Sequence, residues 1–77
     1  MPHFINVILP IPLEKLFTYS VSDAEAAFIQ PGMRVAVPFG KSKIYSALVY
    51  EVHQTPPTVY EAKEIQQILD DTPIVNG

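Results

Sequence analysis

The sequence has 77 residues, which is enough for a single domain. Hydrophobic residues make up 48% of the chain and charged residues 17%, a balance typical of a globular protein rather than a disordered one. The net charge of −3 argues against a protein that coats duplex nucleic acid, because such proteins neutralise many phosphates with Lys and Arg. A pocket that contacts one or two phosphates remains compatible with this charge. The chain has no cysteine, which excludes disulfides and thiolate metal sites.

The two ends of the sequence lead to two expectations. The N-terminal stretch MPHFINVILP lacks the basic segment and the cleavage site of a signal peptide. No apolar run in the sequence is close to the length of a membrane span, which is about 18 residues. We therefore expect a cytoplasmic protein without a membrane partner. The C-terminal stretch TPIVNG carries two apolar residues beyond the last predicted element. We expect a domain at residues 1–72 and the start of a linker at residues 73–77.

The first part of the chain is typical of two strands. Apolar residues alternate with period two in residues 3–9 and again in residues 16–21, which predicts strands that each bury one face. Pro10 and Pro12 end the first strand, because proline cannot donate to a strand ladder. The predicted inward positions are Ile5, Val7 and Leu9 in the first strand and Phe17, Tyr19 and Val21 in the second.

A short helix and a turn follow. In residues 22–29 (SDAEAAFI), Ser22 precedes Glu25 by three residues, which is the spacing of a capping box. This segment predicts about two helical turns. The dipeptide at residues 31–32, Pro-Gly, then predicts a turn into the next strand.

Two further strands are expected, and a fifth element is ambiguous. Residues 34–39 (RVAVPF) alternate like the first two strands. Residues 44–52 (IYSALVYEV) are apolar on both faces, which predicts a strand that is covered on both sides or lines a closed barrel. Residues 60–71 (YEAKEIQQILDD) fit both helical spacing and strand alternation, although propensity favours helix. Short strands punctuated by Pro and Gly predict a mainly β fold, a small barrel or rolled sheet of about five strands with at most one short helix.

The familiar catalytic and metal-binding motifs are not found. The tripeptide GKS at residues 40–42 matches the end of a phosphate-binding P-loop, but Val35 stands where that motif needs glycine, and a strand follows instead of a helix. His3 and His53 lack the neighbouring carboxylates that a metal site of three or four ligands requires. The pair at residues 70–71, Asp-Asp, is typical of a solvated strand end or a turn rather than of a catalytic dyad. The sequence thus presents no nucleophile and no acid–base pair, and we do not expect this chain to be an enzyme.

The stretch RVAVPFGKSK at residues 34–43 is unusual for an acidic chain, because it holds three of the five cations, Arg34, Lys41 and Lys43. They surround a strand that breaks on Pro-Phe-Gly. This arrangement fits either a solvated hairpin or one wall of a site for an anionic ligand.

Two phenylalanines, Phe39 and Phe17, have two interpretations each, and Lys63 has one. Phe39 is either a core residue at the end of its strand or a platform for a ring. Phe17 follows a polar loop and is either a rim aromatic for base stacking or a core partner of Tyr19. Lys63 is an ordinary solvated lysine on pattern alone.

Four blocks of the sequence, in their order, resemble the N-terminal domain of the PriA family of primosomal replication-restart helicases. They are LPIPLEKLFTYSV, QPGMRVAVPFGKSK, ALVYEV and KEIQQILDDTPI. The strongest signatures are the proline-flanked approach to Phe-x-Tyr and the block PGMRVAVPFGK. The resemblance covers essentially the whole chain.

The resemblance implies an OB-like β-barrel or rolled sheet, in which the ambiguous segment is a strand. It implies capture of the 3′ end of the nascent leading strand at stalled replication forks. The implied partners are single-stranded 3′ ends and fork DNA, the remainder of the helicase, the primosome and single-strand-binding proteins, in a bacterial, nucleoid-associated setting. The implied pocket residues are Phe17, Thr18, Tyr19, Phe39, Gly40, Lys41 and Lys63, with the lysine at 63 contributed by the last strand.

The resemblance also implies what this chain lacks. The full-length protein would be an ATP-dependent 3′–5′ DNA helicase, and its ATP, Mg²⁺ and Zn²⁺ would bind in regions absent from this chain, so no cofactor is expected here. The family pattern has an aspartate between the Phe and the Tyr, where this chain has Thr18. A neutral hydroxyl acceptor forms a hydrogen bond about half as strong as a charge-assisted one. The alternative function is a protein-interaction barrel that packs against the helicase core or primosome partners.

Overall fold

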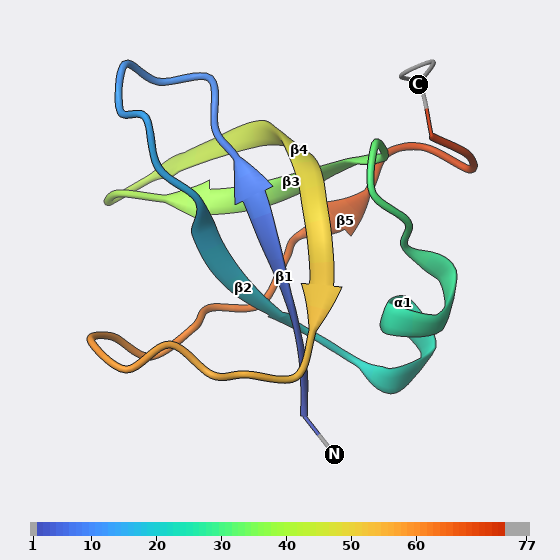
Figure 1. The fold of residues 1–77 in the computed structure, drawn as a ribbon. Helices are drawn as coiled ribbons and strands as arrows, with labels where there is room; N and C mark the ends of the chain where they lie inside the picture. The colour runs from blue at the N-terminus through green and yellow to red at the C-terminus, as the bar shows by residue number, and fades with distance from the viewer. Residues whose placement is uncertain (1, 74–77) are drawn as a thin grey trace.

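Five strands form one antiparallel sheet in the order β2-β1-β4-β3-β5, and one short helix lies beside it (Figure 1). The computed structural model describes residues 2–73, so most of the predicted linker at residues 73–77 lies outside the described residues. The sheet is rolled but not closed into a barrel, and the predicted mainly β fold is confirmed. The elements are β1 (His3–Ile8), β2 (Phe17–Val21), α1 (Asp23–Phe28), β3 (Arg34–Phe39), β4 (Lys43–His53) and β5 (Gln67–Ile68).

The core lies on the inner face of the rolled sheet. The predicted alternation is confirmed for most of the first three strands, because Ile5, Val7, Tyr19, Val21, Val35 and Val37 are buried. The inward Phe17 and Phe39 are only partly buried, and Phe4 beside Ile5 is buried as well. Burial of these β-branched and aliphatic side chains is the main favourable contribution to folding. The largest fully buried side chains are those of Ile5, Val7, Met33, Val35, Val37 and Val49.

The fourth strand, β4, differs from its predicted environment. Residues 44–52 were expected to be covered on both faces or to line a closed barrel, but only one face is buried and the sheet is not closed. Ala47 and Val49 lie in the core, whereas Ile44 and Tyr50 are 54% and 57% exposed. The expectation was wrong because the rolled sheet encloses its core on the inner face, and its outer face meets solvent at these two positions.

A β-bulge interrupts the pairing of β1 with β4. Val7 pairs with Val49, but Asn6 pairs with Glu51, which leaves Tyr50 as the extra residue on β4. The bulge places the side chains of Asn6 and Glu51 opposite each other on the outer face of the sheet. Period-two patterning cannot reveal such an insertion, because the bulge depends on the partner strand.

The helix α1 has the predicted start. The Ser22 hydroxyl accepts a hydrogen bond from the Glu25 N–H at 3.1 Å, and the Glu25 carboxylate accepts from the Ser22 N–H at 2.8 Å. This reciprocal capping box is confirmed. The turn that follows contains Gly32, whose φ of 95° lies in the left-handed region that favours glycine. The helix has six residues, and the described part of the chain contains no helix that could cross a membrane.

The ambiguous C-terminal segment is extended rather than helical. Its strand β5 has only two residues, Gln67 and Ile68, and pairs with β3. Three residues earlier, Glu64 forms an isolated parallel bridge with Ser20 of β2. The segment therefore crosses from one edge of the rolled sheet to the other. Its helix propensity is overridden because extended backbone satisfies the hydrogen-bonding groups of two strand edges and buries Ile65.

Three connections lie on the same side of the molecule. In Figure 1, the loop after β1, the turn between β3 and β4, and the long loop after β4 all lie on the left, opposite α1. These connections bring together segments that are far apart in the sequence, and they surround the edge of β2.

Candidate functional site

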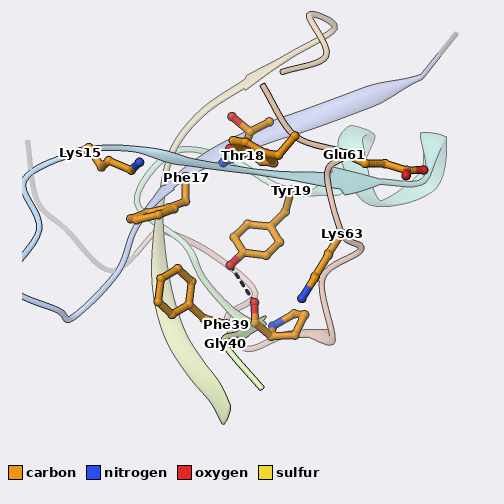
Figure 2. Close-up of a pocket in the computed structure, with 10 residues that line it drawn as sticks. Lys15, Phe17, Thr18, Tyr19, Phe39, Gly40, Glu61 and Lys63 are labelled. Atoms are coloured by element: carbon orange, nitrogen blue, oxygen red, sulfur yellow. Dashed lines mark hydrogen bonds between the residues drawn. The ribbon is translucent and has the colours of Figure 1, made fainter. Parts of the chain in front are cut away.

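A cleft of about 320 Å³ opens between these connections, at the edge of β2 (Figure 2). Three separate segments line it: the start of β2, the end of β3 with the turn that follows, and the chain just before β5. Six of the seven pocket residues predicted from the sequence lie here, namely Phe17, Thr18, Tyr19, Phe39, Gly40 and Lys63.

Two phenylalanine rings form an apolar wall of the cleft. The rings of Phe17 and Phe39 meet edge to face, with centroids 5.1 Å apart and an interplanar angle of 79°. Phe39 also contacts Tyr45 in a similar geometry, at 6.0 Å and 61°. Both phenylalanines are half-buried against the core and also line the cleft. Each ring therefore does both things that the sequence had left as alternatives: it packs against the core and it offers an aromatic surface in the cleft. A ring held in this way can stack on a nucleobase, an interaction worth about 1–3 kcal/mol per base.

Tyr19 joins β2 to the turn after β3. Its Oη donates a hydrogen bond to the carbonyl oxygen of Pro38 at 2.7 Å, drawn as a dashed line in Figure 2. Burial raises the pKa of the Tyr19 hydroxyl above its usual value, and the neighbouring Tyr60 adds to this shift. The hydroxyl donates its proton to the Pro38 carbonyl, and this bond joins the β2 side of the cleft to the Phe39 side.

The turn after β3 leaves open space at Gly40. Its φ of 72° lies in the left-handed region, which a residue with a Cβ adopts only with strain. A Cβ built at this position would have no other atom within 4 Å. The space beside the Gly40 backbone is therefore open to a ligand in the cleft.

The backbone and hydroxyl of Thr18 are both engaged by other residues. Its N–H donates to the Oη of Tyr60 at 2.9 Å. Its Oγ1 donates to the Oδ1 of Asn6 at 2.7 Å. Figure 2 shows that Thr18 and Tyr19 project to opposite sides of β2, as consecutive strand residues must.

Two lysines provide the positive charge of the cleft. The Nζ of Lys15 lies 5.0 Å from the centroid of the Phe17 ring, in a cation–π contact. The exposed Lys63 extends along Tyr19 toward the side of Gly40 (Figure 2). Lys63 was expected in the last strand, but it precedes β5. Its carbonyl oxygen accepts a hydrogen bond from the Ser20 N–H at 2.8 Å, which holds it at the edge of β2.

The cations of residues 34–43 do not gather at this cleft. Arg34 lies at the far end of β3 from the turn, where its Nη2 and Nε lie 3.0 and 3.1 Å from the two carboxylate oxygens of Asp70. This contact lowers the pKa of the Asp70 carboxyl and raises that of the Arg34 guanidinium. Lys41 and Lys43 are exposed and are not among the residues that line the cleft. This stretch therefore contributes Phe39 and Gly40 to one wall of the cleft, but none of its three cations lines it. A ligand contact of Lys41 stays a prediction.

Sequence reasoning did not select three side chains that line the cleft, Lys15, Tyr60 and Glu61. Lys15 could have been found, because it lies two residues before Phe17 in the polar loop LEK. Tyr60 and Glu61 follow a proline-rich loop, and no local pattern connects them with β2. Within residues 2–73, no group of three or more His, Asp or Glu is placed to hold a metal ion.

Comparisons with known proteins identify the family. The sequence matches the family described as 3′DNA-binding domain (3′BD) of PriA over residues 6–77. It is 31% identical over 74 residues to the replication restart protein PriA of Treponema pallidum and 30% identical over 76 residues to that of Bacillus subtilis. These matches cover 91% and 95% of this chain but only 11% and 9% of the relatives, so the chain spans about a tenth of their length. No solved structure gives a significant match. The chain belongs to the 3′ DNA-binding domain family of PriA replication restart proteins.

Proposed function

We propose that the cleft binds the 3′-terminal nucleotide of a DNA strand, and that the chain does so as one domain of a replication restart protein. One observation carries this proposal: Phe17, Gly40 and Lys63, which come from three distant segments, line the same cleft. An aromatic surface, an open backbone position and a cation are what a terminal nucleotide needs for its base, its sugar and its phosphate.

The roles of the side chains follow from their positions. The Phe17 and Phe39 rings stack on or beside the terminal base. Lys15 and Lys63 contact the last one or two phosphates. Thr18 accepts a hydrogen bond from the 3′-hydroxyl, and Gly40 lets the sugar approach the backbone. Capture of an end in this way needs few cations, so the domain retains a net charge of −3 that discourages binding to arbitrary duplex.

The proposal extends to the protein that would contain this domain. The DNA end that this domain would bind is the 3′ end of the nascent leading strand at a stalled fork. The motor domains would be a 3′–5′ helicase that uses ATP and Mg²⁺, with Zn²⁺ in a further region. The partners would be the helicase core, the primosome and single-strand-binding proteins, in a bacterial cytoplasm and near the nucleoid.

The test is a titration of this chain with two fluorescent single strands that differ only at the end, one with a 3′-hydroxyl and one with a 3′-phosphate. We expect a clear preference for the hydroxyl end, measured by fluorescence anisotropy. Phe17→Ala and Lys63→Ala weaken binding, while Lys43→Ala, which removes an exposed lysine outside the cleft, leaves it unchanged. Circular dichroism verifies that each variant is folded. Negligible and equal binding to both strands would instead favour a protein-interaction domain.

A further inference from the structure

The turn between β3 and β4 carries two cations that the cleft does not use. Residues 40–42 form this turn, and Lys41 and Lys43 are exposed on it. Gly40 lines the cleft, but neither lysine does. In residues 2–73 the ion pairs involve other side chains, so neither lysine has a carboxylate partner there. Both positive charges are therefore available to an anion from outside the chain.

The strand register places Lys43 directly beside the cleft. β3 and β4 are antiparallel, and Phe39 is the residue opposite Lys43. Side chains of directly opposite residues project from the same face of a sheet, with Cβ atoms about 4.5–5.5 Å apart. The Phe39 ring lines the cleft, so the aliphatic part of Lys43 begins next to a cleft wall, while its ammonium group extends into solvent. Lys41, in the turn itself, adds a second charge at the same place.

The four lysines around the cleft thus form two pairs with different reach. Lys15 and Lys63 line the cleft and lie on its β2 side. Lys41 and Lys43 lie on the β3 side, outside the cleft. The first pair can contact the phosphates of a nucleotide held in the cleft. The second pair can contact only an anion that passes in front of the turn, on the side of the molecule where the cleft opens (Figure 1).

A captured end that is still paired with its template brings such an anion. A DNA duplex carries about one negative charge per 1.7 Å of its axis, twice the density of one strand. Its two backbones are separated by grooves about 6 and 12 Å wide, so the second backbone passes close to the end of the first. An exposed lysine suits a phosphate at such a place, because an ammonium group is a point charge that needs no fixed geometry.

We propose that Lys41 and Lys43 form a second contact, which binds phosphates of the complementary strand beside the captured end. The domain then binds an end that is paired with its template more tightly than the end of a free single strand. Two such contacts do not suffice for arbitrary duplex, since proteins that hold duplex by its phosphates make about 6–10 of them. This inference rests on the proposed function, and it adds a second strand to the ligand.

The test compares two forms of one fluorescent strand with a 3′-hydroxyl. The first form is the strand alone, and the second is a junction in which a longer complement pairs with the strand and extends past its 3′ end. The labelled strand is identical in both, so its own phosphates are the same. Anisotropy titrations at several salt concentrations give the slope of log affinity against log salt for this chain and for the double variant Lys41→Ala/Lys43→Ala.

The expected difference appears on the junction alone. Each duplex phosphate that is neutralised contributes about −0.9 to the slope, so the double variant should have a junction slope shallower by about 1.8. Between about 50 and 200 mM salt, the parent should lose about 12-fold more affinity for the junction than the variant does. On the single strand, parent and variant should have the same slope. Lys41→Arg/Lys43→Arg keeps both charges and should retain the junction slope of the parent.

A second double variant controls for net charge. Removal of two lysines changes the net charge from −3 to −5. Ala24→Glu/Gln30→Glu produces the same net charge at two exposed positions, one in α1 and one just after it. In Figure 1, α1 lies on the side opposite the connections that surround the cleft. This variant should keep the slopes of the parent on both DNA forms. Circular dichroism verifies that all variants are folded.

Each outcome decides a different point. Equal weakening of the single strand and the junction by Lys41→Ala/Lys43→Ala would assign both lysines to the captured strand and overturn the proposal. Unchanged slopes on both forms would overturn it as well, because the turn would then contact no phosphate. An equal loss of slope in Ala24→Glu/Gln30→Glu would make net charge the cause. The proposed function is judged separately, by the preference of the parent for a 3′-hydroxyl over a 3′-phosphate single strand, to which the turn does not contribute.

Discussion

Removal of one cleft lysine should halve the salt dependence of DNA binding. Each phosphate that a protein neutralises on a single strand contributes about −0.7 to the slope of log affinity against log salt concentration. Two lysines, Lys15 and Lys63, line the cleft. If each contacts one phosphate, the slope is about −1.4 for the parent and about −0.7 for Lys63→Ala.

The assay is a set of anisotropy titrations with a short 3′-hydroxyl strand between about 50 and 200 mM salt, a range in which such contacts are well resolved. Over this fourfold range the parent should lose about 7-fold in affinity and Lys63→Ala only about 2.6-fold. Lys43→Ala is the matched control, because Lys43 has the same charge but lies outside the cleft. It should behave like the parent.

Two results would refute this reasoning. A parent slope steeper than about −4 would mean that the domain coats the phosphate backbone along the strand instead of holding its end. An unchanged slope in Lys63→Ala would mean that this lysine contacts no phosphate, whatever its position in the cleft.

Two predictions concern stability. Tyr19→Phe removes the hydrogen bond to the Pro38 carbonyl and should lower the free energy of unfolding by about 1–2 kcal/mol in urea titrations; an unchanged midpoint would contradict the role of this bond. The contact with Arg34 lowers the pKa of Asp70, so its stabilisation is present above the unfolded-state pKa of about 3.9 and is lost as the pH falls through the folded-state pKa. Asp70→Asn should therefore destabilise the chain at neutral pH, and its difference from the parent in thermal melts should shrink below about pH 4. Asp71→Asn, at an exposed neighbouring carboxylate, should change neither the stability at neutral pH nor its pH dependence. Equal effects of the Asp70 and Asp71 substitutions would reject the Arg34 contact as the cause.

The candidate site was partly accessible from the sequence. Phe17 and Tyr19 were placed on the inward face of their strand by alternation, and that face carries them toward the cleft. The resemblance to PriA added Gly40 and Lys63 to the same pocket, and all four residues line it. The clustering of cations in residues 34–43 did not predict which cations line the cleft. Arg34 belongs to the same short stretch as the turn, but Asp70 holds it at the opposite end of β3.

The bulge and the C-terminal crossing could not be predicted from local pattern. The side chain of Asn6 faces Glu51 only because one extra residue in β4 shifts the register between two strands. Likewise, residues 63–65 lie beside Ser20 because their extended backbone satisfies the edge of β2, against their own propensity for helix. Both features depend on partners that are more than 40 residues apart in the sequence.

The sequence by itself determined which faces of β1, β2 and β3 are buried, where the helix begins and which aromatic and glycine residues stand at the strand ends. These properties act over a few residues, since side-chain alternation, capping and glycine conformations are local. Only the tertiary structure decided which lysines share the cleft and to which side chain the Thr18 hydroxyl donates its hydrogen bond. Lys63 lines the same cleft as Phe17 because the crossing segment pairs with the edge of β2. The Thr18 hydroxyl donates to Asn6 of β1, whose side chain also contacts Glu51 and His53 of β4. Contacts of this kind arise from strand pairing between distant segments, which local patterning does not specify.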